Sequence, residues 1–277
     1  MGWEGVRRAG ADPLDESLPV RGGTAPGRLW VFDFDGTLSP IVPDRNAAGL
    51  HPASRGLLRD LSAQDGDRVA VLSSRALPDL VPRVPVPGVY LGGGSGVEWR
   101  FPGGHRAGMG NEAVRRAESA RAALLPLLAE CAKVPGVEIE DKYWSAAVHH
   151  RKVSPDGWGV LEPLLMRLRS NLNIHSTSGP CVEEYQVLRE VNKAMGIQRL
   201  CRLLRFDPTR GGVLYAGDDE NDGIAMRWVL ARRGRAFAVG GRGWVPGARV
   251  VAGPSGLARA VRALAENGGT GCVLGWR

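Results

Sequence analysis

The chain has 277 residues, of which 43% are hydrophobic and 23% charged, and its formal net charge is +7. This length allows one large domain or two modest ones, and the composition is that of a globular protein. Because no apolar stretch approaches the ~18–20 residues of a membrane-spanning helix, we expect no membrane partner. The basic residues are almost all arginines spread along the chain. We therefore expect no nucleic-acid partner, and instead a positive field that attracts small phosphorylated metabolites.

The first 28 residues mix charged residues with Gly and Pro and lack the apolar segment of a signal peptide. We predict that residues 1–28 form a flexible leader and that the protein is cytoplasmic. The four cysteines are far apart and form no C-x-x-C pair, which agrees with a reducing compartment. They are Cys131, Cys181, Cys201 and Cys272. A monomer is the favoured oligomeric state.

Strand-like apolar runs alternate with helical patterns from residue 29 onward, which is typical of an α/β fold with a largely parallel sheet. In chain order, we predict a strand over 28–34, a helix over 51–64, strands over 67–74 and 88–93, and a hairpin over 96–108. The hairpin turns at 102–104, where the sequence reads Pro-Gly-Gly.

The pattern then changes to that of a smaller α+β unit. It has helices over 111–133 and 155–169 and strands over 136–141, 143–151, 171–177 and 181–187. The α/β alternation resumes with helices over 190–204, 220–234 and 254–267 and strands over 212–218, 235–240 and 248–253. We predict a Rossmann-like core made of 29–105 and 185–277, with 106–184 inserted as a cap. Insertions of this kind serve as lids over the carboxyl edge of the sheet, where open α/β folds bind ligands.

Carboxylates gather at the predicted ends of two strands. Asp33 and Asp35 lie at the carboxyl end of the first strand, and "GDDEND" places Asp218, Asp219 and Asp222 at and just beyond the end of the strand over 212–218. So many acids in one place repel one another unless a hard cation lies among them. Mg²⁺ fits, because it prefers oxygen ligands and keeps waters and a substrate phosphate in its shell.

Two further polar residues lie where an anion would be favoured. Ser73 lies at the end of the strand over 67–74, and Lys193 lies in the first turn of the helix over 190–204. A hydroxyl and an ammonium complement a phosphoryl group. Taken singly, each has a simpler interpretation: Asp33 and Asp35 as a turn, Ser73 as a strand end, and Lys193 as a solvated helix residue. The ordered combination favours the functional one.

The ordered set of D-x-D-G-T, strand-ending Ser, later Lys and G-D-D-x-x-D resembles the four motifs of the haloacid dehalogenase (HAD) superfamily, chiefly phosphatases. The segments "FDFDGTLSPIVPDRNAA", "VAVLSSRAL", "GGGSGVEWR" and "EIEDKYWSAAVHHR" narrow the resemblance to the trehalose-6-phosphate phosphatase family. This implies a HAD core with a cap that contacts sugar.

The resemblance also implies the role of each core residue. Asp33 would be the nucleophile that forms an aspartyl-phosphate, and Asp35 the general acid and base. Ser73 and Lys193 would bind the phosphate. Mg²⁺ would be held by Asp33, the Asp35 backbone carbonyl and Asp218, with Asp219 and Asp222 supporting these ligands.

In the cap, the resemblance implies that Glu140, Lys142 and Arg151 bind sugar hydroxyls. The sequence departs from the family where a glutamate is usual eight residues before the motif lysine, because position 185 is Tyr. Either Glu184 substitutes with a shift of one residue, or the sugar differs. A second departure is "GDDENDGIAM", which lacks the usual Glu and Phe beside the metal carboxylates. His149 and His150 are adjacent on a predicted strand, so at most one of them can face the sugar.

The function that we predict is a Mg²⁺-dependent phosphatase acting on a disaccharide-type sugar phosphate, with trehalose 6-phosphate as the leading substrate. Sucrose phosphate, glucosylglycerol phosphate, mannosyl phosphoglycerate and a pseudodisaccharide phosphate stay open as alternatives. A glycosyltransferase that makes the substrate could be a partner. The alternative from another class is a non-catalytic sugar-phosphate-binding partner protein.

Overall fold

The computed structural model describes residues 27–171, 174–179, 181–241 and 244–267. The described chain divides into two compact units, one containing residues 107–191 and the other residues 27–106 and 192–267. The predicted leader over 1–28 lies almost wholly outside the described residues, as does Cys272. No helix in the described ranges is long and apolar enough to cross a membrane.

The larger unit is built on an eight-stranded sheet with the order β12-β11-β10-β1-β2-β3-β4-β5. The strands are β1 (Leu29–Phe32), β2 (Arg68–Leu72), β3 (Val89–Gly93), β4 (Glu98–Arg100), β5 (Arg106–Ala107), β10 (Val213–Gly217), β11 (Arg235–Val239) and β12 (Arg249–Val251). The strands from β12 to β3 are parallel, and β4 is antiparallel to β3. The predicted α/β class with a largely parallel sheet is confirmed.

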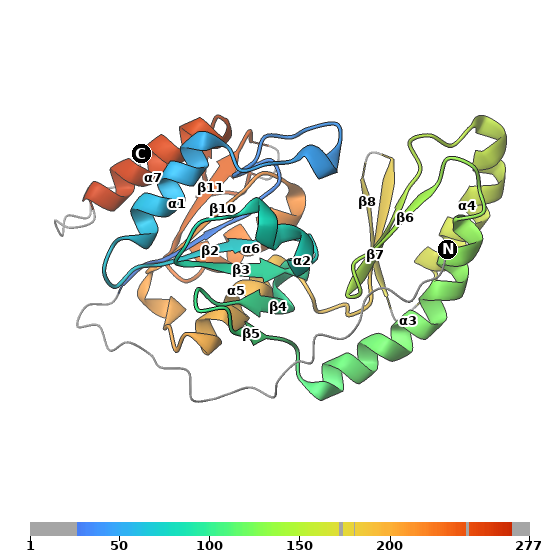
Figure 1. Cartoon of the computed structure of the whole chain (residues 1–277), viewed down its shortest axis with the longest axis horizontal. Coiled ribbons are helices and arrows are strands. Elements are labelled where there is room, and N and C mark those ends of the chain that lie inside the picture. The colour runs from blue at the N-terminus through green and yellow to red at the C-terminus, as the bar shows by residue number, and fades with distance from the viewer. Residues whose placement is uncertain (1–26, 172–173, 180, 242–243, 268–277) are drawn as a thin grey trace. The chain divides into compact units, whose positions relative to one another are not determined.

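Two pairs of helices belong to the larger unit (Figure 1). Helix α1 (Pro52–Ser62) packs on α7 (Gly253–Asn267), and α5 (Lys193–Leu203) packs on α6 (Glu220–Leu230). Trp30 and Phe32 of β1 lie in one buried cluster with residues of α1 and α7. Because side chains alternate along a strand, Leu29 and Val31 point to the opposite face. All four side chains are fully buried, which explains why β1 reads as an unbroken apolar run.

The short elements of the larger unit include one helix that the sequence pattern does not predict. This is α2 (Leu77–Leu80), which continues into the 3-10 helix η2 (Val81–Arg83). Four residues are too few to show helical periodicity. The other 3-10 helices are η1 (Arg45–Ala47), η3 (Gly94–Gly96) and η4 (Pro208–Arg210).

The smaller unit is an antiparallel sheet with the order β6-β7-β9-β8 and two helices. The strands are β6 (Glu138–Asp141), β7 (Ser145–His149), β8 (His175–Gly179) and β9 (Val182–Gln186). Figure 1 shows α3 (Asn111–Cys131) and α4 (Pro155–Arg169) on the same side of this sheet. Part of the predicted strand over 171–177 falls on residues 172–173, outside the described residues.

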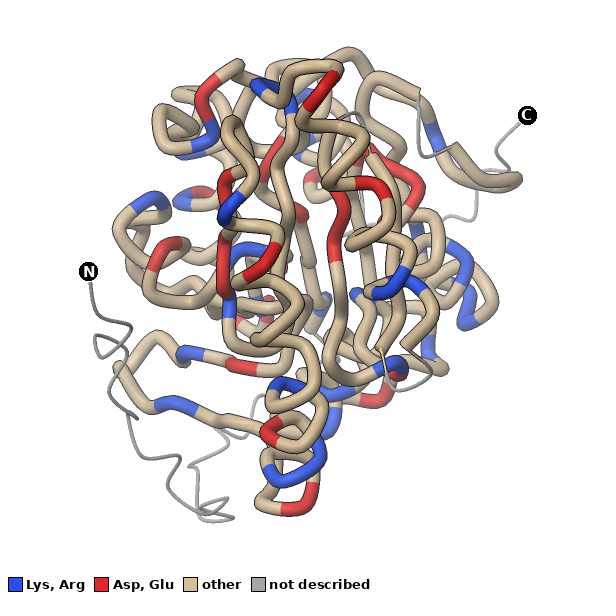
Figure 2. The backbone as a smooth tube through the Cα atoms, turned by 90° about the vertical axis from the view of Figure 1, so that its right-hand side faces the viewer, with Lys and Arg blue, Asp and Glu red and all other residues tan. Residues whose placement is uncertain are grey.

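Charged residues are interspersed along the described backbone. Figure 2 shows segments of Lys and Arg alternating with segments of Asp and Glu over much of the tube. The excess of positive charge is therefore spread among many acidic neighbours, in agreement with the wide distribution of arginine in the sequence.

Candidate active site

The first acidic residue of the site follows the central strand. Asp33 comes directly after β1, and its backbone N–H donates to the carbonyl of Ala216 on β10 at 2.8 Å. The side chain of Asp33 is only 5% exposed. The chain then turns at Gly36, whose φ of +79° is in the left-handed region that favours glycine. An ionisable group is thus fixed at the carboxyl edge of a fully apolar strand.

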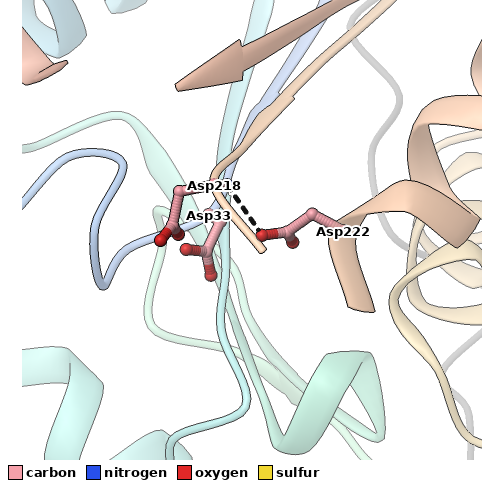
Figure 3. A group of neighbouring side chains, drawn as sticks. All are labelled: Asp33, Asp218 and Asp222. Atoms are coloured by element: carbon pink, nitrogen blue, oxygen red, sulfur yellow. Dashed lines mark hydrogen bonds between the residues drawn. The ribbon is translucent and has the colours of Figure 1, made fainter. Parts of the chain in front are cut away.

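The second group of acids lies beside it because β1 pairs with β10 in parallel, Phe32 opposite Ala216. Asp218 directly follows β10, and Asp219 is the N-cap of α6. Asp219 and Asp222 form a capping box: the Asp222 N–H donates to Asp219 Oδ1 at 3.0 Å, and the Asp219 N–H donates to Asp222 Oδ2 at 3.2 Å. The capping box turns Asp222 back toward the end of β10. Figure 3 shows the carboxylates of Asp33 and Asp218 side by side, with Asp222 pointing from α6 toward the backbone N–H of Asp218.

Asp222 is saturated with hydrogen bonds. Its Oδ1 accepts from Lys193 Nζ and from the Tyr215 hydroxyl, each at 2.5 Å. Its Oδ2 accepts from the backbone N–H groups of Asp218 at 2.9 Å and Asp219 at 3.2 Å. A carboxylate has about four acceptor directions, and here all four are used. Asp222 therefore acts as a fixed anchor for its neighbours.

Lys193 connects the anchor to the first acid. It is the first residue of α5, which begins where the Asn192 side chain accepts from the Met195 N–H at 3.0 Å. Its Nζ donates to Asp33 Oδ1 at 2.7 Å as well as to Asp222. The Lys193 side chain is 7% exposed, so this ion pair is shielded from water. The predicted helix thus holds a buried ammonium between two carboxylates.

Burial and the mutual repulsion of the acids shift the pKa values of this cluster. Burial raises the pKa of Asp33 well above its usual value, the Lys193 ammonium opposes this, and the charges of Asp222 and Asp218 add to it. Burial and the Asp222 charge raise the pKa of Asp218 to about 7. Lys193 holds the pKa of Asp222 down against its burial. A bound cation would favour the charged forms of carboxyl groups that lie this close together.

Asp33, Asp218 and Asp222 could hold a metal ion, since each offers an oxygen and the three oxygens lie within 4.8 Å of one another. An all-oxygen set suits a hard divalent cation such as Mg²⁺. Because Asp222 is already saturated, the two acids with capacity to bind a metal directly are Asp33 and Asp218. Asp222 and Asp219 would orient them from behind. The residues present therefore fit the ion that the sequence predicts.

Asp35 lies apart from this carboxylate cluster and binds an arginine that the sequence reasoning missed. Arg75 Nε donates to Asp35 Oδ2, and Arg75 Nη2 donates to Asp35 Oδ1, both at 2.7 Å. The only sequence signal for Arg75 is its place two residues after Ser73. Tyr215 was missed as well, because a tyrosine inside an apolar strand reads as core.

Ser73 is buried and directly follows β2, the strand on the other side of β1. Its hydroxyl accepts from the Arg75 N–H at 3.1 Å. It therefore lies at the same edge of the sheet as Asp33, and it binds the backbone that carries Arg75. The role of Ser73 in phosphate binding stays a prediction.

In the smaller unit, three of the predicted sugar-binding residues lie near one another on the sheet. They are Glu140, Lys142 and Glu184. Glu140 lies opposite Ala147, which lies opposite Glu184, and residues directly opposite each other share a face. Lys142 Nζ donates to Glu184 Oε1 at 2.9 Å, and the Ser145 hydroxyl donates to the same oxygen at 3.0 Å. This places Glu184 beside Lys142.

The neighbouring residues divide between the two faces. Tyr185 points the opposite way from Glu184 and is fully buried. His149 lies 3.3 Å from Glu140 (Nε2 to Oε2), whereas the ring of His150 lies against Trp158 of α4 with the centroids 5.0 Å apart. Only one of the two histidines therefore shares the face of Glu140. Arg151 is exposed in the turn after β7.

A parallel sheet with this acid and lysine constellation at its carboxyl edge, interrupted by an α+β insertion, is the architecture of a HAD-type hydrolase. A haloacid dehalogenase-like hydrolase from Bacteroides thetaiotaomicron has this fold, with a TM-score of 0.62 and 17% identity over 86% of this chain and 99% of that one. A solved trehalose-6-phosphate phosphatase related protein matches with a TM-score of 0.68 and 18% identity, over 87% of this chain and 98% of that one.

The chain belongs to the trehalose-phosphatase family, whose sequence model matches residues 31–239. It is 32% identical over 203 residues to a trehalose-phosphate phosphatase of Mycobacterium tuberculosis (strain ATCC 25618 / H37Rv), which is 69% of this chain and 48% of that protein. The chain thus spans about half the length of the curated relatives it matches. The family predicted from the sequence motifs is confirmed.

Proposed function

We propose that this chain is a Mg²⁺-dependent phosphatase that hydrolyses a disaccharide-type sugar phosphate, with trehalose 6-phosphate as the first candidate. The observation that carries the proposal is the buried Asp33 carboxylate, held by Lys193 Nζ at 2.7 Å beside Asp218, in a member of the trehalose-phosphatase family. A nucleophile, a cation and a place for a metal then lie together at one strand end.

In the first step that we propose, a carboxylate oxygen of Asp33 attacks phosphorus. Oδ1 is bound by Lys193, so we assign the attack to Oδ2. The bond between phosphorus and the sugar oxygen breaks, and Asp35 gives a proton to that oxygen. Lys193 neutralises charge that develops on the phosphoryl group, and Ser73 donates a hydrogen bond to it.

In the second step, water attacks the aspartyl-phosphate, and Asp35 takes up a proton from that water. The bond between phosphorus and the Asp33 oxygen breaks, which releases inorganic phosphate and restores both carboxyl groups. Bound Mg²⁺ would supply positive charge to the phosphoryl oxygens, and Asp33, the Asp35 carbonyl and Asp218 would hold it. Asp222 keeps Lys193 and the start of α6 in place through both steps.

We propose that Glu140, Lys142, Glu184 and Arg151 bind the hydroxyls of the sugar. The contact of Lys142 with Glu184 supports this, because it brings an ammonium, a serine hydroxyl and a carboxylate together at one place on the sheet. A sugar offers hydroxyls that both donate and accept, and it can bind to such a pair. This assignment also favours Glu184 as the residue that takes the place of the displaced family glutamate.

The proposal extends to the localisation, the oligomeric state and the source of the substrate. We propose a cytoplasmic monomer that takes its substrate from a glycosyltransferase. The described cysteines are all free, and burial raises the pKa of the Cys131 thiol to about 11 and that of Cys201 to about 12. Thiols of this kind are unreactive, as is usual for structural cysteines in a reducing compartment.

The test is phosphate release from a panel of sugar phosphates with Mg²⁺, comparing the wild type with Asp33→Asn. The panel contains trehalose 6-phosphate, sucrose phosphate, glucosylglycerol phosphate and mannosyl phosphoglycerate. Preference for trehalose 6-phosphate supports the whole proposal, and preference for another sugar keeps the chemistry and changes the assignment of Glu140, Lys142 and Glu184. No release from any substrate, with the variant indistinguishable from the wild type, would favour a non-catalytic binding protein.

A further inference from the structure

We propose that Arg75 is a positioning residue for Asp35, and that Asp79 and the carbonyl of Arg45 hold Arg75 in place. The inference rests on the proposed function and extends it from the reacting residues to the group that aims the proton donor. In the free chain, an acid at a turn would sample several rotamers. Here Arg75 sets the rotamer of Asp35, and Asp79 in turn holds Arg75 in place.

The contact between Arg75 and Asp35 is a paired one. The guanidinium donates two parallel hydrogen bonds, Nε to Oδ2 and Nη2 to Oδ1, each 2.7 Å long. This geometry fixes both the place and the plane of a carboxylate, which a single contact from a lysine could not do. The Arg75 side chain is 3% exposed and that of Asp35 is 44% exposed. A buried, ordered cation thus holds an acid whose other side is open.

Arg75 is held back from following Asp35 if that side chain moves, because two of its other three N–H donors bind further acceptors. Nη1 donates to Asp79 Oδ2 at 2.7 Å, and Nη2 donates also to the Arg45 carbonyl at 2.8 Å. Asp79 is held in turn by Arg83, whose Nη2 donates to its Oδ1 at 2.8 Å. Helix α2, which carries Asp79, is therefore the support for the whole arrangement.

The loop after the Asp33 turn is bound by the same two arginines. Arg75 binds the Arg45 carbonyl, and Arg83 Nη1 donates to the carbonyls of Asn46 at 2.9 Å and Ala48 at 2.7 Å. The backbone of Arg75 is held as well, since its N–H donates to Ser73 Oγ at 3.1 Å and its carbonyl accepts from Gly94 at 2.7 Å. Both the guanidinium and the backbone that carries it are thus fixed.

The paired contact leaves part of the Asp35 carboxyl group open to a substrate. The two bonds from Arg75 use two of the about four acceptor directions of the carboxylate, one on each oxygen. The other two directions point away from the guanidinium, and the Asp35 side chain as a whole is 44% exposed. A proton held there can be given to a leaving oxygen while the paired contact persists. Arg75 therefore decides in which direction the proton of Asp35 is presented.

The consequence is a dependence on the leaving group. A sugar alkoxide is strongly basic and needs the proton of Asp35 when the bond to phosphorus breaks, whereas p-nitrophenolate is weakly basic and leaves without it. The constant kcat/KM reports only the steps up to that departure. If Arg75 aims Asp35, its loss lowers kcat/KM for the sugar phosphate much more than for p-nitrophenyl phosphate. Damage to the fold lowers both together.

The experiment measures this ratio of kcat/KM values for the Mg²⁺-loaded wild type, Arg75→Met, Arg75→Lys and Asp79→Asn. General acid catalysis contributes roughly 10²–10⁴-fold, so we expect the ratio to fall at least about tenfold in Arg75→Met. A smaller fall of about threefold is expected in Asp79→Asn, which keeps the paired contact but loosens its support. The fall in the ratio for Arg75→Lys should lie between those of the other two variants, because lysine keeps the positive charge but cannot make the paired hydrogen bonds.

Arg199→Met is the matched control. Arg199 is another buried arginine of the larger unit, and its Nη1 donates to the carbonyls of Gly96 and Val97 at 3.0 Å each. We expect this variant to lose stability without a change in the ratio. If Arg75→Met does not fold, Asp79→Asn decides the question, because Asp79 is about one-third exposed.

Each outcome separates this proposal from the one it rests on. A ratio that is unchanged in folded Arg75→Met and Asp79→Asn, or that rises, would overturn the positioning role while leaving the phosphatase in place. A wild type that hydrolyses neither substrate would instead overturn the proposed function. A fall in the ratio that is equally large in Arg199→Met would mean that general loosening, and not the aim of Asp35, controls the leaving group.

Discussion

Gly36→Ala should damage the proposed metal site through one added methyl group. An ideal Cβ at position 36 would lie 2.2 Å from Asp218 Oδ2 and 2.3 Å from Asp218 Cγ. Ordinary contacts of such a carbon begin near 3.4 Å, so the carboxylate would have to move by more than an ångström. The turn after Asp33 thus has no room for a side chain, because Asp218 fills the space.

Gly36→Ala has two effects that can be measured separately, backbone strain and displacement of Asp218. At a φ of +79°, an alanine is strained by about 1–2 kcal/mol whatever surrounds it. The displacement of Asp218 is a further cost, and it acts on the metal. Mg²⁺ requires near-ideal geometry, and disturbing even the partners of a metal ligand typically costs about 10–100-fold in affinity. We therefore expect Gly36→Ala to bind Mg²⁺ at least about tenfold more weakly.

Gly104→Ala provides the matched control, because Gly104 also has a left-handed backbone, with a φ of +91°, but has no atom within 4 Å of its added Cβ. Both variants should show the loss of stability that backbone strain produces, measured by thermal unfolding of the metal-free protein. Only Gly36→Ala should show weaker binding in a calorimetric titration with Mg²⁺, together with a loss of phosphate release. Equal Mg²⁺ affinity in the two variants would refute the argument that Asp218 holds the metal from this position.

Three further predictions concern the acids and the sugar face. Asp33→Asn should lower phosphate release at least about a thousandfold, because it removes the nucleophile. The variant should keep the circular dichroism spectrum of the wild type, since the side-chain volume hardly changes. Substantial residual turnover would argue against an aspartyl-phosphate. The Asp218 pKa of about 7 is raised by burial above the usual 3.8, so this carboxyl opposes folding increasingly as the pH rises toward and past 7. The metal-free protein should therefore melt at a lower temperature at pH 8 than at pH 6, and Mg²⁺ affinity should rise over the same interval because the ligand must be deprotonated; affinity that is constant with pH would contradict this. Lys142→Met should raise KM for the sugar phosphate several-fold and leave p-nitrophenyl phosphate turnover unchanged, since it removes the partner of Glu184 at 2.9 Å; equal effects on both substrates would mean that Lys142 does not bind the sugar.

Much of the architecture can be read from local sequence. The run over β1 is fully buried in the structure, and a strand that is buried on both faces must be continuously apolar. The alternation of strands and helices predicts the parallel sheet, and the carboxyl ends of parallel strands meet at one edge. The sequence therefore predicts that Asp33 and Asp218 lie close together.

Local sequence also explains where the helices of the site begin. Asn192 is an N-cap, which makes Lys193 the first residue of α5, and the spacing of Asp219 and Asp222 is that of a capping box. The position of a residue in its motif therefore predicts that its side chain lies at this edge of the sheet. It does not predict which group each one binds.

The partners of the charged groups were decided by the tertiary structure alone. Asp35 and Arg75 are 40 residues apart, and Lys193 and Asp33 are 160 apart. No local pattern signals such pairs, because an arginine after a strand or a tyrosine within one has many possible environments. Tyr215 and Arg75 were missed for this reason. Which acid is saturated and which can still bind a metal depends on how many donors surround it, and only the folded chain brings those donors together.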